Sequence, residues 1–156
     1  NNALPDLWVT GDSVILGIRY ELGDQRTIGL INARVGRQAP ELLEVIRHDK
    51  ISVGNSPIIF NLGNNNALTR TQVSDIFAEV QNQSQIIVVN TAVPRPWRDA
   101  NNSLISEFAA QNWRVRVVDW AAISNGHPEY FAPDGVHLKP AGIRVYVAAI
   151  MESLNK

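Results

Sequence analysis

Short apolar runs rich in Ile and Val alternate with stretches of helical periodicity along the chain, and this alternation is the strongest constraint on its fold. Apolar runs predict strands at residues 7–10, 27–32, 57–62, 85–93 and 115–120. Helical spacing predicts helices over 14–22, 40–48, 69–81, 99–112 and 140–154, with a long loop over 121–138. Five β-α units in series predict an α/β fold, a three-layer α/β/α sandwich around a five-stranded parallel sheet.

The composition is that of an ordinary globular chain of 156 residues, with a formal net charge of −1. This charge balance gives no reason to expect nucleic acid as a partner. Because cysteine is absent, disulfides, thiolate metal sites and a cysteine nucleophile are excluded. No internal repeat or linker is present, so we expect a single domain over 1–156. The sequence contains neither a signal peptide nor an apolar run of membrane-spanning length. We expect it to be a mature form or a domain cut from a longer protein.

Small polar residues follow the predicted strands, and the carboxyl ends of parallel strands meet at the edge of the sheet where ligands bind. Serine-based acyl transfer needs a nucleophile, a base, a group that orients the base, and donors for the oxyanion. Ser13 stands where the first strand turns into a helix, which places its own N–H at a helix N-terminus. Gly36 offers an unobstructed backbone N–H, and Asn65 offers a side-chain amide.

The chain contains three histidines, and one of them must be the base. His48 is interpreted as a surface residue at the end of a helix, and His127 lies in the long loop. His137 stands three residues after Asp134, a spacing that lets the carboxylate hold Nδ1–H and leaves Nε2 free. Taken singly, each signal also fits a structural role: Asp12 or Ser13 as a helix cap, and Asp134 as the start of a turn.

Taken in order, these residues resemble the blocks of the SGNH (GDSL) hydrolase family. The matching residues are Gly11-Asp12-Ser13, Gly36, Gly63, Asn65, Asp134 and His137. The resemblance implies a flavodoxin-like SGNH hydrolase fold and a catalytic triad of Ser13, Asp134 and His137. It also implies an oxyanion hole formed by Ser13, Gly36 and Asn65, and no cofactor or metal.

Longer segments are similar to the extracytoplasmic catalytic domain of peptidoglycan O-acetyltransferases, namely RVGRQ, VPR, VDW and GHPEYFAPDGVHL. This likeness implies that Ser13 takes an acetyl group from a donor and passes it to a muramic acid hydroxyl of cell-wall glycan. It also implies a covalent link to a membrane acyltransferase module, at the outer face of the bacterial cell membrane. NLGNNNAL replaces the more usual G-T-N-G, although Asn65 still falls on the asparagine.

Candidate glycan contacts are aromatic or cationic residues near the strand ends, since aromatic rings stack on sugars and arginine binds carboxylates. They are Arg37, Arg95, Trp97 and Trp120, for which packing or a solvated charge is an equally good explanation. Three alternatives stay open. A carbohydrate or lipid esterase would use the same triad with water as acceptor. A glycan- or nucleotide-binding domain without catalysis would leave the triad unexplained. The remaining alternative is a metal site formed by His127, Glu129, Asp134 and His137.

Overall fold

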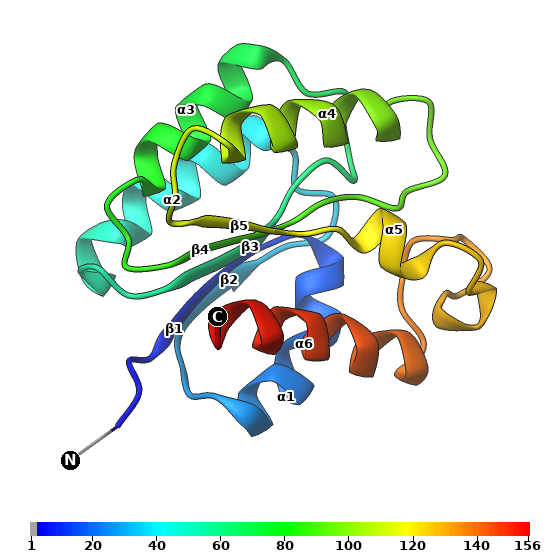
Figure 1. The fold of residues 1–156 in the computed structure, drawn as a ribbon, viewed down its shortest axis with the longest axis horizontal. Helices are drawn as coiled ribbons and strands as arrows, with labels where there is room; N and C mark the ends of the chain where they lie inside the picture. Colours follow the sequence, from blue (N-terminus) through cyan, green and yellow to red (C-terminus); the bar gives the residue numbers. More distant parts are fainter. Residues whose placement is uncertain (1–2) are drawn as a thin grey trace.

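The computed structural model describes residues 3–156, whose middle layer is a parallel sheet with the strand order β2-β1-β3-β4-β5 (Figure 1). The strands are β1 (Leu7–Gly11), β2 (Ile28–Ala33), β3 (Ile58–Asn61), β4 (Ile86–Val89) and β5 (Val115–Val118). The chain adds β2 on one side of β1 and then β3 on the other, so the strand order reverses between β1 and β3. Ligands of such sheets bind at the carboxyl ends of the strands beside this reversal.

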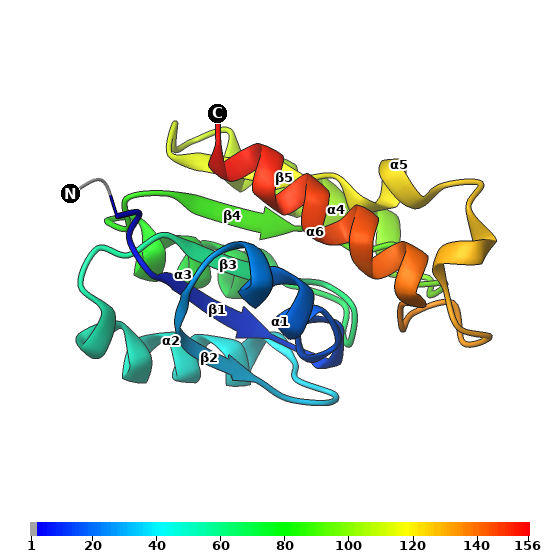
Figure 2. The ribbon, with the colours of Figure 1, turned by 90° about the horizontal axis from the view of Figure 1, so that it is seen from below.

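Helices cover both faces of the sheet (Figures 1 and 2). One face packs against α1 (Ser13–Gln25) and α6 (Pro140–Leu154), and the other against α2 (Ala39–Val53), α3 (Arg70–Val80) and α4 (Arg98–Ala109). Side chains of β1 alternate between the two cores: Leu7 and Val9 belong to the first, and Trp8 to the second. Burial on both faces explains the continuous apolar runs of the sequence. The predicted three-layer α/β/α fold is therefore confirmed.

Two helix boundaries bear on the candidate residues. α2 continues to Val53, so the prediction that His48 ends a helix is wrong. Asp49 is buried and accepts a hydrogen bond from the Asn32 amide at 2.9 Å, which holds this part of α2 against β2. α3 begins with a capping box, in which Thr69 and Gln72 bond each other's backbone N–H groups.

The segments after β4 and β5 also differ from the prediction. β4 ends at Val89 rather than at residue 93. The amide of Asn102 bonds both the N–H and the carbonyl of Thr91, at 3.0 and 2.8 Å, and so replaces a neighbouring strand there. The predicted loop over 121–138 contains most of α5 (Trp120–Ser124) and the short 3₁₀ helix η1 (Pro128–Tyr130).

α6 approaches η1 closely, and this contact places the segment that carries His137. A Cβ atom on Gly142 would lie 2.3 Å from the carbonyl oxygen of Tyr130, so only glycine fits at this point of α6. The segment is closed by hydrogen bonds from Lys139 N to Tyr130 O and from Ala132 N to His137 O, each 2.8 Å long. Within residues 3–156, no helix has the length and apolar character needed to cross a membrane.

Candidate active site

Ser13 lies at the first position of α1, directly after the turn that follows β1. This turn is tight, because a Cβ atom on Gly11 would lie 2.0 Å from the side-chain oxygen of Asn61. The hydroxyl oxygen of Ser13 lies 2.8 Å from Nε2 of His137, which is 124 residues away in the chain. The structure thus brings the predicted nucleophile and the predicted base within hydrogen-bond distance of each other.

His137 also contacts Asp134, through the other nitrogen of its ring. Nδ1 lies 2.5 Å from Oδ2 of Asp134, while Oδ1 accepts hydrogen bonds from the N–H groups of Val136 and His137 at 2.8 and 3.0 Å. The His137 side chain, followed by these backbone donors, lowers the pKa of Asp134 from 3.8 to about 2. An ionised Asp134 keeps the proton of the ring on Nδ1, and Nε2 is then free to accept the hydroxyl proton of Ser13.

Asp12 is buried beneath this turn and binds the asparagine loop to it. Oδ1 accepts hydrogen bonds from Val14 N at 2.9 Å and from the Asn61 amide at 2.6 Å. Oδ2 accepts hydrogen bonds from the amides of Asn64 and Asn65, at 2.9 and 3.2 Å. Asp12 therefore caps α1, the structural role that the sequence allowed for it, and at the same time fixes the loop after β3.

The predicted oxyanion donors lie on three loops around this turn. Arg34 N donates to Gly11 O at 3.1 Å, which attaches the Gly36 loop to the turn before Ser13. Gly36 is exposed with φ 76°, and no described residue accepts a hydrogen bond from its N–H or from that of Ser13. The amide of Asn65 instead donates to Asp12 and, at 3.0 Å, to Arg37 O. An oxyanion would have to share or replace one of these two bonds.

Two of the predicted glycan contacts are engaged inside the protein. Arg37 is buried, and its guanidinium donates to the backbone and side-chain oxygens of Asn32 at 2.8 and 3.1 Å. Trp120 is only 4% exposed and packs on Tyr130 and Tyr146, so packing is the correct explanation for it. Arg95 is exposed and Trp97 is half-buried at the start of α4, and both stay predicted contacts.

The residues of the alternative metal site form two separate pairs. His127 Nδ1 lies 3.0 Å from Glu129, and the ring stacks on Tyr130. His137 contacts Asp134, as described above. Within the described part of the chain, no group of three or more His, Asp or Glu side chains is arranged to hold a metal ion.

Several further polar side chains lie at the carboxyl ends of the strands and were not predicted from the sequence. Asn61 ends β3, Asn90 follows β4 and Asp119 follows β5. Asn61 bonds Asp12 in both directions, and Asn90 donates to Asp119 at 3.0 Å. The signal that could have found them is a polar residue ending a buried apolar run, because that position faces the ligand edge of a parallel sheet.

Comparison with known proteins relates the sequence of this chain to proteins named as O-acetyltransferases. No family model matches the chain. The peptidoglycan O-acetyltransferase OatA of Listeria monocytogenes is 39% identical over 94% of the chain, and YrhL of Bacillus subtilis, assigned the same activity, is 36% identical over 93%. The chain spans 23% of the length of each of these relatives.

Solved structures agree with these relatives. The C-terminal catalytic domain of OatA from Streptococcus pneumoniae, solved with a methylsulfonyl adduct, aligns over 99% of the chain and 94% of its own length, with a TM-score of 0.82 and 20% identity. A protein assigned as an SGNH hydrolase, from Slackia heliotrinireducens, aligns over 98% of the chain and 100% of its own length, with a TM-score of 0.80 and 16% identity. The chain is therefore a homologue of one segment of the peptidoglycan O-acetyltransferases, and it has the fold of the SGNH hydrolases.

Proposed function

We propose that this chain is the catalytic domain of a longer O-acetyltransferase, which moves an acetyl group through Ser13 to a hydroxyl of cell-wall glycan. The observation that carries the proposal is the series of contacts from Ser13 Oγ to His137 Nε2, at 2.8 Å, and from His137 Nδ1 to Asp134, at 2.5 Å. This arrangement supports a nucleophile, its base and the group that orients the base. The named activity of the relatives supports an acetyl group as cargo and peptidoglycan as acceptor.

The reaction proceeds in two displacements. In the first, His137 Nε2 takes the hydroxyl proton while Ser13 Oγ attacks the carbonyl carbon of the acetyl donor. The N–H groups of Ser13 and Gly36 and the Asn65 amide hold the oxyanion, and His137 then protonates the leaving oxygen of the donor. In the second, His137 takes a proton from the acceptor hydroxyl, which attacks the acetyl-Ser13 ester. The proton returns to Ser13 Oγ as the acetylated sugar leaves.

Asp134 acts through His137. Because its pKa is lowered to about 2, it is ionised throughout the physiological range and stabilises the imidazolium that forms in each displacement. Its bonds from Val136 N and His137 N keep the carboxylate in place when the ring changes charge. No cofactor or metal takes part in this scheme.

A second candidate function is hydrolysis of an acetyl ester, with water in place of the sugar hydroxyl. The exposure of the site favours it, since the side chains of His137 and Asp134 are 50% and 46% exposed. Water therefore reaches the base directly, and an acetyl-enzyme without a bound sugar would hydrolyse. Sugar transfer requires an acceptor that occupies this position more effectively than water.

We also propose that the domain works at the outer face of the bacterial membrane, joined covalently to a membrane acyltransferase module. Two observations support this placement. The relatives are about four times longer than the segment that the chain matches, and their named substrate, peptidoglycan, lies outside the cytoplasmic membrane. Limited proteolysis of intact cells should release the domain from the membrane, and this release would test the proposed location.

The test of the chemistry is hydrolysis of p-nitrophenyl acetate. The Ser13→Ala and His137→Ala variants should each hydrolyse this ester at least about 10³-fold more slowly than the wild type, because the two side chains act as a unit. Ser84→Ala is the matched control, since Ser84 is exposed and belongs to neither the triad nor the oxyanion loops. Mass spectrometry of acid-quenched wild type should show an acetyl adduct on Ser13. Wild-type rates in either triad variant would refute the proposal.

Transfer is separated from hydrolysis by adding an acceptor. With the same donor and a chitooligosaccharide or muroglycan, mass spectrometry should detect acetylated sugar, and its yield should rise with acceptor concentration. If free acetate is the sole product at every acceptor concentration, the chain is an esterase of the same fold.

A further inference from the structure

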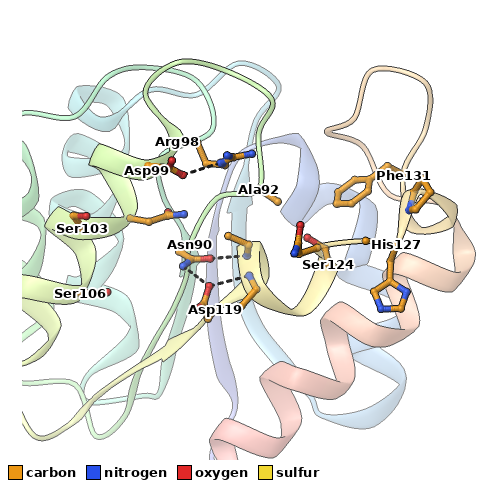
Figure 3. Close-up of a pocket in the computed structure, with 16 residues that line it drawn as sticks. Asn90, Ala92, Arg98, Asp99, Ser103, Ser106, Asp119, Ser124, His127 and Phe131 are labelled. Carbon is orange, nitrogen blue, oxygen red and sulfur yellow. Dashed lines mark hydrogen bonds and ion pairs between the residues drawn. The ribbon is translucent and has the colours of Figure 1, made fainter.

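A groove lies between α4 and the segment formed by α5 and η1, at the carboxyl ends of β4 and β5 (Figure 3). Its volume is about 770 Å³, within the range of ligand-binding pockets. In Figure 3 the side chains of Ser103 and Ser106 come from α4, while Phe131 and His127 belong to the opposite wall. None of the triad residues lines this α4–α5 groove, so the geometry of the active site leaves it unexplained.

The groove and the active site share a wall. Asn90, Ala92 and Phe131 line the groove, and they also line a small internal cavity whose other side includes Val14 and Val136. Val14 is the neighbour of Ser13, and Val136 is the neighbour of His137. The side chains of Asn90, Ala92 and Phe131 therefore separate the groove from the residues beside Ser13 and His137.

Asp119 presents a fixed carboxylate to the groove. Its Oδ1 accepts hydrogen bonds from the Asn90 amide at 3.0 Å and from Ala122 N at 3.1 Å, and these bonds are drawn in Figure 3. No described residue donates a hydrogen bond to Oδ2, and the residue is exposed. A carboxylate held at one oxygen offers the other to a ligand hydroxyl at little entropic cost, in a charge-assisted hydrogen bond.

The lining selects the class of ligand. Among the described residues that line the groove, Phe131 is the one large apolar side chain, and the rest are mainly hydroxyl, amide and charged groups or alanine. An acyl chain would cover these polar groups without replacing their hydrogen bonds to water. Asp99 is paired with Arg98 at 3.0 Å, and both line the groove, so Asp119 supplies the charge that would repel an anionic ligand. Hydroxyl and acetamido groups can bond to such walls, which favours an uncharged sugar chain.

We propose that the α4–α5 groove binds the sugar chain of the acceptor, with Asp119 accepting hydrogen bonds from its hydroxyl groups. The inference rests on the proposed acetyl transfer. That reaction needs a site where a sugar displaces water beside Ser13, and the groove would supply this site. Under this proposal, sugar binding in the groove, rather than the triad, decides whether the acetyl group is transferred to sugar or hydrolysed by water.

The test uses chitopentaose as the probe and a tryptophan to fill the groove. Ser106 lies on the exposed face of α4 inside the groove, and Ala100 is exposed on the same helix outside it. Ser106→Trp should weaken chitopentaose binding, measured by calorimetry, at least about tenfold. The share of acetyl that reaches sugar rather than water should fall by a similar factor. Ala100→Trp should behave as wild type, and equal urea midpoints would show that both variants are folded.

Asp119→Asn tests the carboxylate itself, since the amide oxygen can keep the bonds from Asn90 and Ala122 while Oδ2 is replaced by NH₂. The KM for chitopentaose as acceptor should rise about tenfold, the effect of losing a charge-assisted hydrogen bond.

Binding that is unchanged in Ser106→Trp, or absent in the wild type, would overturn the inference. The rate of p-nitrophenyl acetate hydrolysis by the wild type separates the two proposals. Hydrolysis without sugar binding refutes the groove alone, whereas sugar binding without Ser13-dependent hydrolysis refutes the acetyl transfer.

Discussion

The buried carboxylate of Asp12 can be tested by Asp12→Asn, which preserves shape but removes one acceptor. Each carboxylate oxygen accepts two hydrogen bonds: Oδ1 from Val14 N and the Asn61 amide, and Oδ2 from the Asn64 and Asn65 amides. Either orientation of the new amide therefore turns its NH₂ group toward two donors. No rotation of the side chain relieves this conflict.

The cost follows from the two donors that lose their acceptor. A buried donor left without a partner costs about 1–3 kcal/mol, so the loss of two acceptors should lower the free energy of unfolding by about 2–6 kcal/mol. Hydrolysis of p-nitrophenyl acetate should also fall, because the asparagine loop loses its attachment to the turn of Ser13.

Urea unfolding measures the first effect, with Asp24→Asn as the control, because Asp24 is exposed and its substitution makes the same change in charge. A free energy of unfolding for Asp12→Asn within about 0.5 kcal/mol of the wild type would refute the reasoning, since that is the scale of ordinary surface substitutions. Asp24→Asn should stay inside that range.

Three further predictions concern the triad and two glycines. His137→Ala should raise the pKa of Asp134 from about 2 toward 3.8, because the His137 side chain is the largest cause of the lowered pKa. A carboxyl ¹³C titration measures this pKa, and an unchanged value would contradict the prediction. The lowered pKa stabilises the fold above pH 3.8, and this contribution is lost as the pH falls through about 2; the stability of His137→Ala should therefore depend less on pH in that window. The double variant Ser13→Ala/His137→Ala should be no slower than either single variant, and multiplying losses would show that the two side chains act independently. Gly142→Ala should destabilise the protein by about 1–3 kcal/mol through its clash with the Tyr130 carbonyl. Gly17→Ala, on an open face of α1, should instead stabilise it by about 0.5–1 kcal/mol; effects of the same sign in thermal unfolding would be inconsistent with the packing described.

The alternation of apolar runs and helical periodicity predicted every strand of the sheet and its parallel arrangement. Burial on both faces leaves a continuous apolar pattern in β1, β3 and β4, whereas β2 keeps exposed residues. Boundaries were less predictable where a distant side chain decided them. β4 stops at Val89 because Asn102 bonds the backbone of Thr91. No pattern within residues 85–93 contains that information.

The contacts of Ser13 with His137 and of His137 with Asp134 were predictable because these residues lie after a strand and in one short turn, positions that the order of elements brings together. The orientation of side chains was not predictable. Arg37 turns inward to Asn32, Trp120 packs under Tyr130, and the Asn65 amide bonds Asp12. Each depends on competition among several partners in three dimensions. The α4–α5 groove was missed for the same reason, since its walls come from segments far apart in the sequence.

Ser13 and His137 are separated by 124 residues, and this has a consequence for the timing of activity. A chain that grows from its N-terminus gains the asparagines that fix the serine turn with the loop after β3, and it gains the base only when the segment before α6 has docked. Until then Ser13 Oγ has no imidazole beside it to accept its proton. Under the proposed mechanism, a truncated or incompletely folded chain should therefore be inactive.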